Sequence, residues 1–167
     1  MESYQIALIP GDGIGPTVVE KTRPLIDAVA HSHDFAIQYN VHEWGSERYL
    51  ETDAMMPDDS LSQLRPADAI FVGAVGHPDI PDHITLNGLL LPIRKAFDQY
   101  ICKRPSVLYP GVESPLRGYT GRSIDFVVFR ENTEGEYADI GGREHQGFQT
   151  ETAVQSALFT REGVTRI

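Results

Sequence analysis

The apolar run at residues 69–75, Ala-Ile-Phe-Val-Gly-Ala-Val, most constrains how this chain can fold. A strand that is apolar on both faces is typical of a parallel sheet whose two sides are covered. Residues 4–9 and 35–41 also indicate strands, and residues 15–30 between them indicate a helix. Strands that alternate with helices predict an α/β fold with a largely parallel sheet.

Shorter helices are expected around this strand. Residues 45–65 predict two short helices that are broken at Pro57. An apolar stripe at helical spacing follows the loop at residues 76–83. Its members are Leu86, Leu89, Leu90, Ile93 and Phe97. Because Pro92 lacks the N–H that a helix interior needs, the regular helix should begin only near Leu89.

The last third of the chain predicts more strands, at residues 100–109, 124–129 and 149–159. We expect the last of them to pair with residues near Tyr137. Thr160 is suited to cap a helix that would continue to the last residue, Ile167. A helix of two turns is marginal in water without further packing. The chain is therefore expected to be a fragment or a truncated gene product.

The charge of the chain excludes several classes of partner. Lys and Arg number 14 and Asp and Glu 24, for a net charge of −10. Nucleic acids and anionic membranes are bound by basic patches, so neither is expected as the main partner. The start of the chain does not resemble a signal peptide, and no apolar stretch is long enough to span a bilayer. We therefore expect a cytoplasmic protein.

A glycine-rich turn, Gly11-Asp-Gly-Ile-Gly15, lies between the first strand and the first helix. Its third glycine comes one position too early for the dinucleotide-binding pattern G-x-G-x-x-G. A glycine-rich turn still lets a ligand approach the backbone closely. Contact with a nucleotide and a simple tight turn therefore both remain open from the residues alone.

Three arginines, Arg94, Arg104 and Arg130, stand out by position. Arg94 lies beside the apolar helical stripe, Arg104 lies in a strand-like run, and Arg130 ends the apolar strand at 124–129. If they converge, they would bind a small polycarboxylate through charge-assisted, two-point hydrogen bonds. From spacing alone, three separate salt bridges are the simpler expectation. No general base accompanies the single cysteine, Cys102, which we interpret as a packing residue.

Five segments, in this order, are more specific than any single motif. They are Ile9-Pro-Gly-Asp-Gly-Ile-Gly-Pro16, Gly73-Ala-Val-Gly76, Leu90-Leu-Pro-Ile-Arg94, Lys103-Arg-Pro105 and Arg130-Glu-Asn-Thr-Glu-Gly-Glu-Tyr137. Together they resemble the β-decarboxylating dehydrogenases, the family of isopropylmalate, isocitrate, tartrate and D-malate dehydrogenases. Asp82-His-Ile-Thr-Leu86, Phe97-Asp-Gln-Tyr100 and Gly141-Gly-Arg143 are most similar to the tartrate/D-malate branch. The resemblance implies the family's three-layer α/β fold, which is not a Rossmann fold, in truncated form.

The resemblance also implies a reaction: NAD- and Mg²⁺- or Mn²⁺-dependent oxidative decarboxylation of a small 2-hydroxy dicarboxylate such as D-malate or tartrate. Arg94, Arg104 and Arg130 match the family's carboxylate-binding arginines, and Tyr137 matches its acid. Leu90 lies where the family reads the third substituent of the substrate. An apolar residue at this position disfavours a third carboxylate.

The cofactor-side residues implied by the resemblance lie in the first hundred residues. They are Ile14, Ala74, Val75, Gly76, Leu86 and Asn87. Asn87 and Leu89 stand where the tartrate/D-malate branch often has Trp and Ser, which leaves the substrate within the branch open.

Family members are longer, and the resemblance implies that the general-base Lys and the metal-binding Asp residues belong to a C-terminal half beyond Ile167. No metal ligand is therefore assigned in this chain. Residues 1–99 would begin the cofactor-side domain and residues 100–167 the substrate and dimerisation domain, both incomplete. The chain alone is expected to be inactive, and the complete enzyme to be a homodimer. The alternatives are isopropylmalate dehydrogenase and a non-catalytic binding or dimerisation protein.

Overall fold

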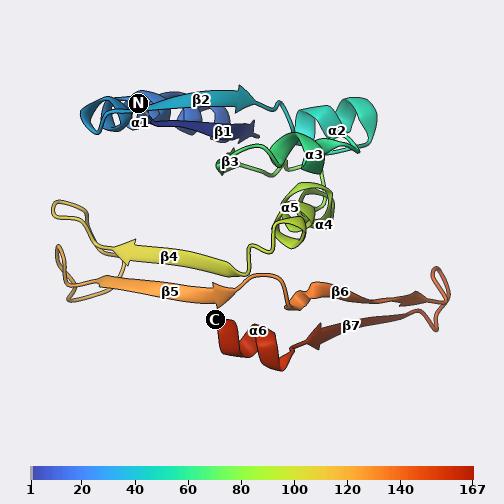
Figure 1. The fold of residues 1–167 in the computed structure, drawn as a ribbon. Helices are drawn as coiled ribbons and strands as arrows, with labels where there is room; N and C mark the ends of the chain where they lie inside the picture. The colour runs from blue at the N-terminus through green and yellow to red at the C-terminus, as the bar shows by residue number, and fades with distance from the viewer. Residues whose placement is uncertain (1) are drawn as a thin grey trace. The chain divides into compact units, whose positions relative to one another are not determined.

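The structure is a computed structural model that describes residues 2–167 (Figure 1). It divides into two compact units, an N-terminal unit, Met1–Ile93, and a C-terminal unit, Arg94–Ile167. Within the described residues, no helix is long and apolar enough to cross a membrane.

A three-stranded parallel sheet forms the centre of the N-terminal unit. Its strands lie in the order β2-β1-β3, with bounds β1 Glu2–Gly11, β2 Phe35–Val41 and β3 Ala69–Ala74. The helix α1, Gly15–Ser32, connects β1 to β2 and packs against the sheet (Figure 1). The side chains of Leu8, Ile9 and Val19 are buried between these elements. The predicted alternation of parallel strands and helix is confirmed here.

The strand β3 is less covered than its apolar sequence predicts. It pairs with β1 alone, and five of its six residues are only partly buried. The prediction of full cover on both faces is therefore wrong for this chain, because β3 lies at an edge of the sheet that the chain forms.

The two short helices expected before β3 are present. They are α2, Ser46–Thr52, and α3, Ser60–Leu64, and Pro57 lies between them. Trp44, Met55 and Leu64 are buried around them and extend the core of the N-terminal unit.

The segment after β3 is helical earlier than predicted. It consists of α4, Asp82–Thr85, a π-helical turn η1, Leu86–Leu90, and α5, Leu91–Ala96. The expectation that regular helix begins near Leu89 is wrong. Pro92 lies in the first turn of α5, where the missing N–H is tolerated, and the wider π-helical turn keeps the preceding residues helical.

The C-terminal unit contains two antiparallel strand pairs and a short helix. The pairs are β4, Ile101–Val107, with β5, Asp125–Glu131, and β6, Gly135–Glu144, with β7, Thr152–Leu158. The expectation of a largely parallel sheet therefore holds only for the N-terminal unit. Antiparallel strands need no crossover helix, and none lies between β4 and β5 or between β6 and β7.

The helix α6, Arg161–Arg166, ends the described chain as expected. Thr160 is its N-cap: the Thr160 hydroxyl oxygen accepts a hydrogen bond from the Gly163 N–H at 3.0 Å. The predicted pairing of the last strand with the region of Tyr137 is also confirmed, because β7 pairs with β6.

Candidate active site

The register of β4 and β5 brings two of the three arginines to one face of the strand pair. Cys102 is directly opposite Arg130, and Arg104 follows Cys102 by two positions. Opposed residues point to the same face of a sheet, as do residues two apart on one strand. Arg104 Nε donates a hydrogen bond to the Cys102 sulfur at 3.4 Å. The predicted packing residue Cys102 thus lies between two arginines.

Arg94, in the last turn of α5, belongs to the same neighbourhood. The pKa of the Cys102 thiol is lowered, first by the hydrogen bond from Arg104 and then by the positive charges of Arg130, Arg104 and Arg94. Burial opposes this effect. Arg94 therefore acts electrostatically on the same thiol that Arg104 contacts and that Arg130 faces across the strand pair. We call Arg94, Arg104 and Arg130 the arginine cluster.

The arginine cluster has no acidic partners of its own. Among residues 2–167, ion pairs are formed by other basic residues, such as Arg143 with Glu151 and Arg166 with Asp98. The simpler expectation of three separate salt bridges is therefore not met. In a chain of net charge −10, three neighbouring cations that form no ion pair among residues 2–167 are suited to attract an anion.

Tyr137 lies at the edge of this cluster, on β6. The guanidinium carbon of Arg130 lies 5.4 Å from the centre of the Tyr137 ring. Tyr137 also acts electrostatically on Arg104 and contributes to a raised pKa of that guanidinium, after the larger effects of the Cys102 hydrogen bond and charge. The structure thus brings Tyr137 together with the three predicted arginines.

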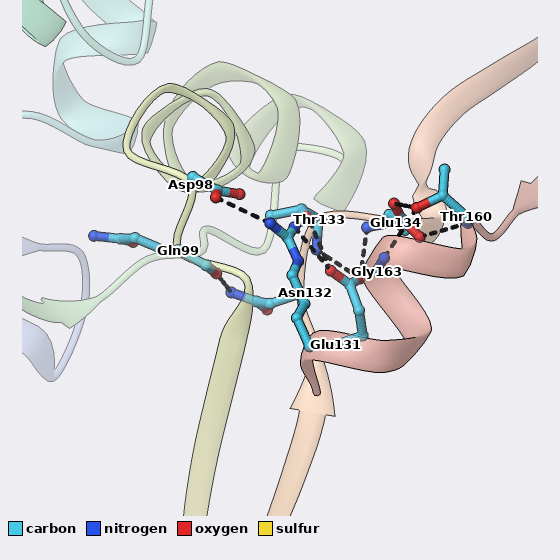
Figure 2. A network of polar contacts seen from close by, with 9 residues as sticks. Asp98, Gln99, Glu131, Asn132, Thr133, Glu134, Thr160 and Gly163 are labelled. Carbon is cyan, nitrogen blue, oxygen red and sulfur yellow. Dashed lines mark hydrogen bonds and ion pairs between the residues drawn. The ribbon is translucent and has the colours of Figure 1, made fainter.

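A tight turn between Arg130 and Tyr137 makes this approach possible. Glu131 accepts hydrogen bonds from the Thr133 N–H at 2.8 Å, the Thr133 hydroxyl at 2.6 Å and the Glu134 N–H at 2.6 Å (Figure 2). Burial raises the pKa of Glu131, but these hydrogen bonds outweigh it and hold the pKa below its usual value. The ionised carboxylate therefore organises the turn.

Residues of helix α6 and its N-cap form hydrogen bonds with the same turn. Glu134 accepts hydrogen bonds from the Thr160 N–H at 2.9 Å and the Thr160 hydroxyl at 2.6 Å (Figure 2). Arg166 donates to Thr133 Oγ1 at 3.1 Å and to Asp98 at 3.0 Å. We call this set of contacts the turn network.

Sequence analysis missed one residue of this region, Asn132. Its side chain is only 5% exposed and is hydrogen-bonded to the Arg130 guanidinium and to the backbone carbonyl of Gln99; Figure 2 shows the bond to Gln99. The one signal in the sequence is its place inside the segment that joins Arg130 to Tyr137.

The predicted cofactor-side residues lie in the N-terminal unit, and several meet where β1 and β3 end. The Asp12 N–H donates to the Ala74 carbonyl at 2.6 Å, and the Gly76 N–H donates to the Asp12 carboxylate at 2.9 Å. Ile14, at the start of α1, is 70% exposed and free to contact a ligand. The carboxyl ends of parallel strands are where α/β sheets bind ligands.

The glycines of the turn at 11–15 have two different roles. A Cβ on Gly11 or on Gly15 would collide with the Ala74 backbone, so packing alone requires both glycines. Gly13 has a φ of +56° and open space around it. The tight-turn interpretation is thus sufficient for Gly11 and Gly15.

Leu86, Asn87 and Leu90 lie on the π-helical turn η1. Asn87 is exposed at a pocket of about 490 Å³ whose other lining residues include Tyr49, Met55, Leu61 and His83. Leu89 is completely buried, whereas Leu90 is half-buried. The apolar residue at position 89 is therefore part of the core.

Within residues 2–167, no three His, Cys, Asp or Glu side chains are placed to hold a metal ion. The described residues therefore supply no complete metal site of their own.

Comparison with known proteins identifies the class. The family model described as isocitrate/isopropylmalate dehydrogenase matches residues 5–167. The structure is similar to isocitrate dehydrogenase from Methylococcus capsulatus, with a TM-score of 0.78 and 26% identity over 98% of this chain and 44% of that one. It is also similar to a β-decarboxylating dehydrogenase from Thermococcus kodakarensis, with a TM-score of 0.65 and 29% identity over 98% of this chain and 42% of that one. The chain belongs to the isocitrate/isopropylmalate dehydrogenase family.

Its sequence is also similar to curated proteins named tartrate dehydrogenase/decarboxylase and D-malate dehydrogenase. It is 50% identical to a probable tartrate dehydrogenase/decarboxylase of Agrobacterium vitis, over the whole chain and 47% of that protein. It is 49% identical to the decarboxylating D-malate dehydrogenase of Escherichia coli, again over the whole chain and 47% of that protein. The chain therefore spans about half the length of the curated relatives it matches.

Proposed function

We propose that this chain supplies the carboxylate-binding and cofactor-side residues for NAD- and divalent-metal-dependent oxidative decarboxylation of a small 2-hydroxy dicarboxylic acid, such as D-malate or tartrate. The observation that carries this proposal is the arginine cluster, which gathers around Cys102 without a carboxylate partner among residues 2–167. The similarity to tartrate and D-malate dehydrogenases supports the choice of substrate class.

In this reaction the substrate loses hydride from C2 and the hydroxyl proton, which leaves a β-keto acid. The bond to the carboxylate on C3 then breaks to release CO₂, and the resulting enolate takes a proton on C3. Arg94, Arg104 and Arg130 bind and orient the carboxylates, so that the carboxylate to be lost is held in a fixed geometry. The Tyr137 hydroxyl, beside Arg130, donates the proton to C3.

We assign the cofactor side to Ile14, Ala74, Val75, Gly76, Leu86 and Asn87. Held by these residues, NAD⁺ would supply the acceptor for the hydride that leaves C2. The exposed Ile14 and the 74–76 backbone, which is fixed through Asp12, are suited to contact a flat cofactor ring. Leu90 offers no charge to a third carboxylate and so disfavours tricarboxylic substrates.

The proposal includes the oligomeric state and the location of the protein: the complete enzyme is a cytoplasmic homodimer. The strand pairs of the C-terminal unit, whose exposed apolar residues include Phe126 and Phe129, offer surface for a second subunit.

The test is a titration of the 167-residue chain with D-malate and with meso-tartrate, in which isothermal titration calorimetry measures the dissociation constant. We expect binding that Arg104→Gln or Arg130→Gln weakens by at least about tenfold, because each removes a charged hydrogen-bond donor. Arg143→Gln is the matched control, because Arg143 forms an ion pair with Glu151, the residue before β7. This variant should leave binding unchanged. Equal binding by all variants would contradict the proposal.

A substrate panel separates the alternatives. Stronger binding of 3-isopropylmalate than of D-malate would favour isopropylmalate dehydrogenase. We also expect the chain alone to form no NADH from D-malate, NAD⁺ and Mn²⁺, and NADH formation in this assay would contradict the expected inactivity.

A further inference from the structure

The side chain of Asn132 is buried in a unit where most side chains are exposed. It is 5% exposed, whereas its neighbours on β5, such as Val128 and Phe129, are 44% and 56% exposed. A buried amide is costly unless its donor and acceptor are both satisfied. Asn132 satisfies both, with partners on different segments of the C-terminal unit.

The two hydrogen bonds of Asn132 fix its orientation. The Asn132 Nδ2–H donates to the Gln99 carbonyl at 3.0 Å, and Asn132 Oδ1 accepts from Arg130 Nη2 at 3.0 Å. A carbonyl only accepts and a guanidinium only donates, so a flipped amide would lose both bonds. The oxygen of Asn132 therefore faces Arg130.

Gln99 connects this amide to a second arginine. The Gln99 N–H donates to the Arg94 carbonyl at 2.9 Å. One peptide segment is thus bonded through its N–H to Arg94 and through its carbonyl to Asn132, which in turn holds the guanidinium of Arg130. Asn132 ties together the parts of the chain that carry two members of the arginine cluster.

The guanidinium of Arg130 has few other restraints. Its hydrogen bond to Asn132 is the one it makes among residues 2–167, and its Nε is buried without a partner in the same part of the chain. The Tyr137 ring, whose centre lies 5.4 Å from the guanidinium carbon, can attract the charge of Arg130 but forms no directional hydrogen bond that would fix its orientation. A long arginine side chain otherwise samples many rotamers.

We propose that Asn132 is a positioning residue that holds the Arg130 guanidinium toward the bound carboxylate. This inference rests on the proposed function, because it assumes that Arg130 binds the substrate. Asn132 does not itself touch the substrate. It acts by limiting the rotamers of Arg130 before the ligand arrives, which reduces the entropy lost on binding.

Asn132→Ala in the 167-residue chain tests this inference with two readouts. The first is the dissociation constant for D-malate, which we expect to rise about tenfold, the loss of one charged hydrogen bond. The second is the pH profile of Cys102 alkylation by iodoacetamide, which reports the Arg130 charge because Cys102 is the only cysteine. If Arg130 moves away from the thiol, the profile shifts to higher pH, toward that of Arg130→Gln.

The controls separate positioning from a structural role. Asn40→Ala removes an exposed amide from β2 and should change neither readout. A purely structural Asn132 would lower the unfolding midpoint while D-malate binding and the alkylation profile stay as in the wild type, and this result would overturn the inference. If Asn132→Ala does not fold, Asn132→Gln, which displaces the amide by one methylene, is compared in the same way.

The design also separates this inference from the proposed function. If the wild type binds neither D-malate nor tartrate but Asn132→Ala still shifts the alkylation profile, Asn132 positions Arg130 and the proposed substrate is wrong. If the wild type binds D-malate and Asn132→Ala leaves both readouts unchanged, the proposed function stands and the positioning role is wrong.

Discussion

The two units of this chain are stabilised in different ways. The N-terminal unit has an apolar core in which Leu8, Ile9 and Leu64 are almost completely buried. In the C-terminal unit Leu108 is the one buried apolar side chain among the described residues, and the phenylalanines of β5 are exposed. Its most enclosed contacts are instead polar: the turn network and Asn132.

This difference shows where the chemistry can be placed. A packed core tolerates few charged groups, whereas charged groups near the surface stay hydrated and are screened by the solvent. The arginine cluster and Tyr137 both belong to the polar unit. The predictions below test whether the two units depend on these different forces.

The largest effect is expected in the core of the N-terminal unit. Leu8→Ala should lower the free energy of unfolding of this unit by about 3 kcal/mol, because it leaves a cavity among fully buried side chains. Urea unfolding followed by Trp44 fluorescence measures this, since Trp44 is the only tryptophan and lies in the same unit. A loss below about 1 kcal/mol would mean that this core is not tightly packed.

A smaller but substantial effect is expected from the turn network. Arg166→Ala removes hydrogen bonds to Asp98 and Thr133 and a guanidinium that lies 4.3 Å from the centre of the Tyr100 ring. We expect a loss of about 2 kcal/mol in the C-terminal unit, measured by hydrogen exchange of the β5 and β6 amides. Arg143→Ala removes a more exposed ion pair and should cost under about 0.5 kcal/mol. Equal effects of the two variants would contradict a special role for the network.

The ionised Glu131 carboxylate is expected to contribute about 1 kcal/mol to the free energy of unfolding, a value that already allows for partial solvent screening. This contribution depends on pH. The pKa of Glu131 is lower in the folded chain, so the carboxylate stabilises the fold above its ordinary pKa of about 4.3. That contribution is lost as the pH falls through the folded pKa. Glu131→Gln should therefore be less stable than the wild type at pH 7, and thermal unfolding should show this difference shrinking as the pH falls below the ordinary glutamate pKa. A difference that does not change with pH would exclude this charge effect.

The smallest effect is expected on the exposed face of β5. Phe129→Ser should change the stability of the C-terminal unit by under about 0.5 kcal/mol, because the ring is 56% exposed and fills no core. Chemical denaturation of the single chain at low concentration measures this. A loss as large as that of Leu8→Ala would show that β5 packs against a core after all.

The sequence predicted most elements of the N-terminal unit and the positions of β4, β5 and β7 in the C-terminal unit, but gave no bounds for β6. Period-two and period-3.6 patterns report local structure, and β2 was predicted with its observed bounds. They carry no information on strand direction, so the antiparallel direction of β4-β5 and of β6-β7 was not predicted, although the pairing of the last strand with the region of Tyr137 was. The π-helical turn η1 was missed because no local pattern distinguishes it from an ordinary helix.

The candidate site was predictable only through family resemblance. Spacing alone favoured separate salt bridges for Arg94, Arg104 and Arg130, because the register that places Arg130 opposite Cys102 is a long-range property. Asn132 was missed for the same reason. Its partner Gln99 lies 33 residues away, and nothing local marks an amide that will be buried.

Protection of Cys102 from iodoacetamide by D-malate tests the central claim most directly. The thiol is in contact with Arg104 and opposite Arg130, so a dicarboxylate bound there would cover it and, by its negative charge, raise the thiol pKa. We predict that the alkylation rate falls with D-malate concentration and saturates, and that Arg130→Gln abolishes this protection. An alkylation rate independent of D-malate, in folded wild-type protein, would contradict a carboxylate site at the arginine cluster.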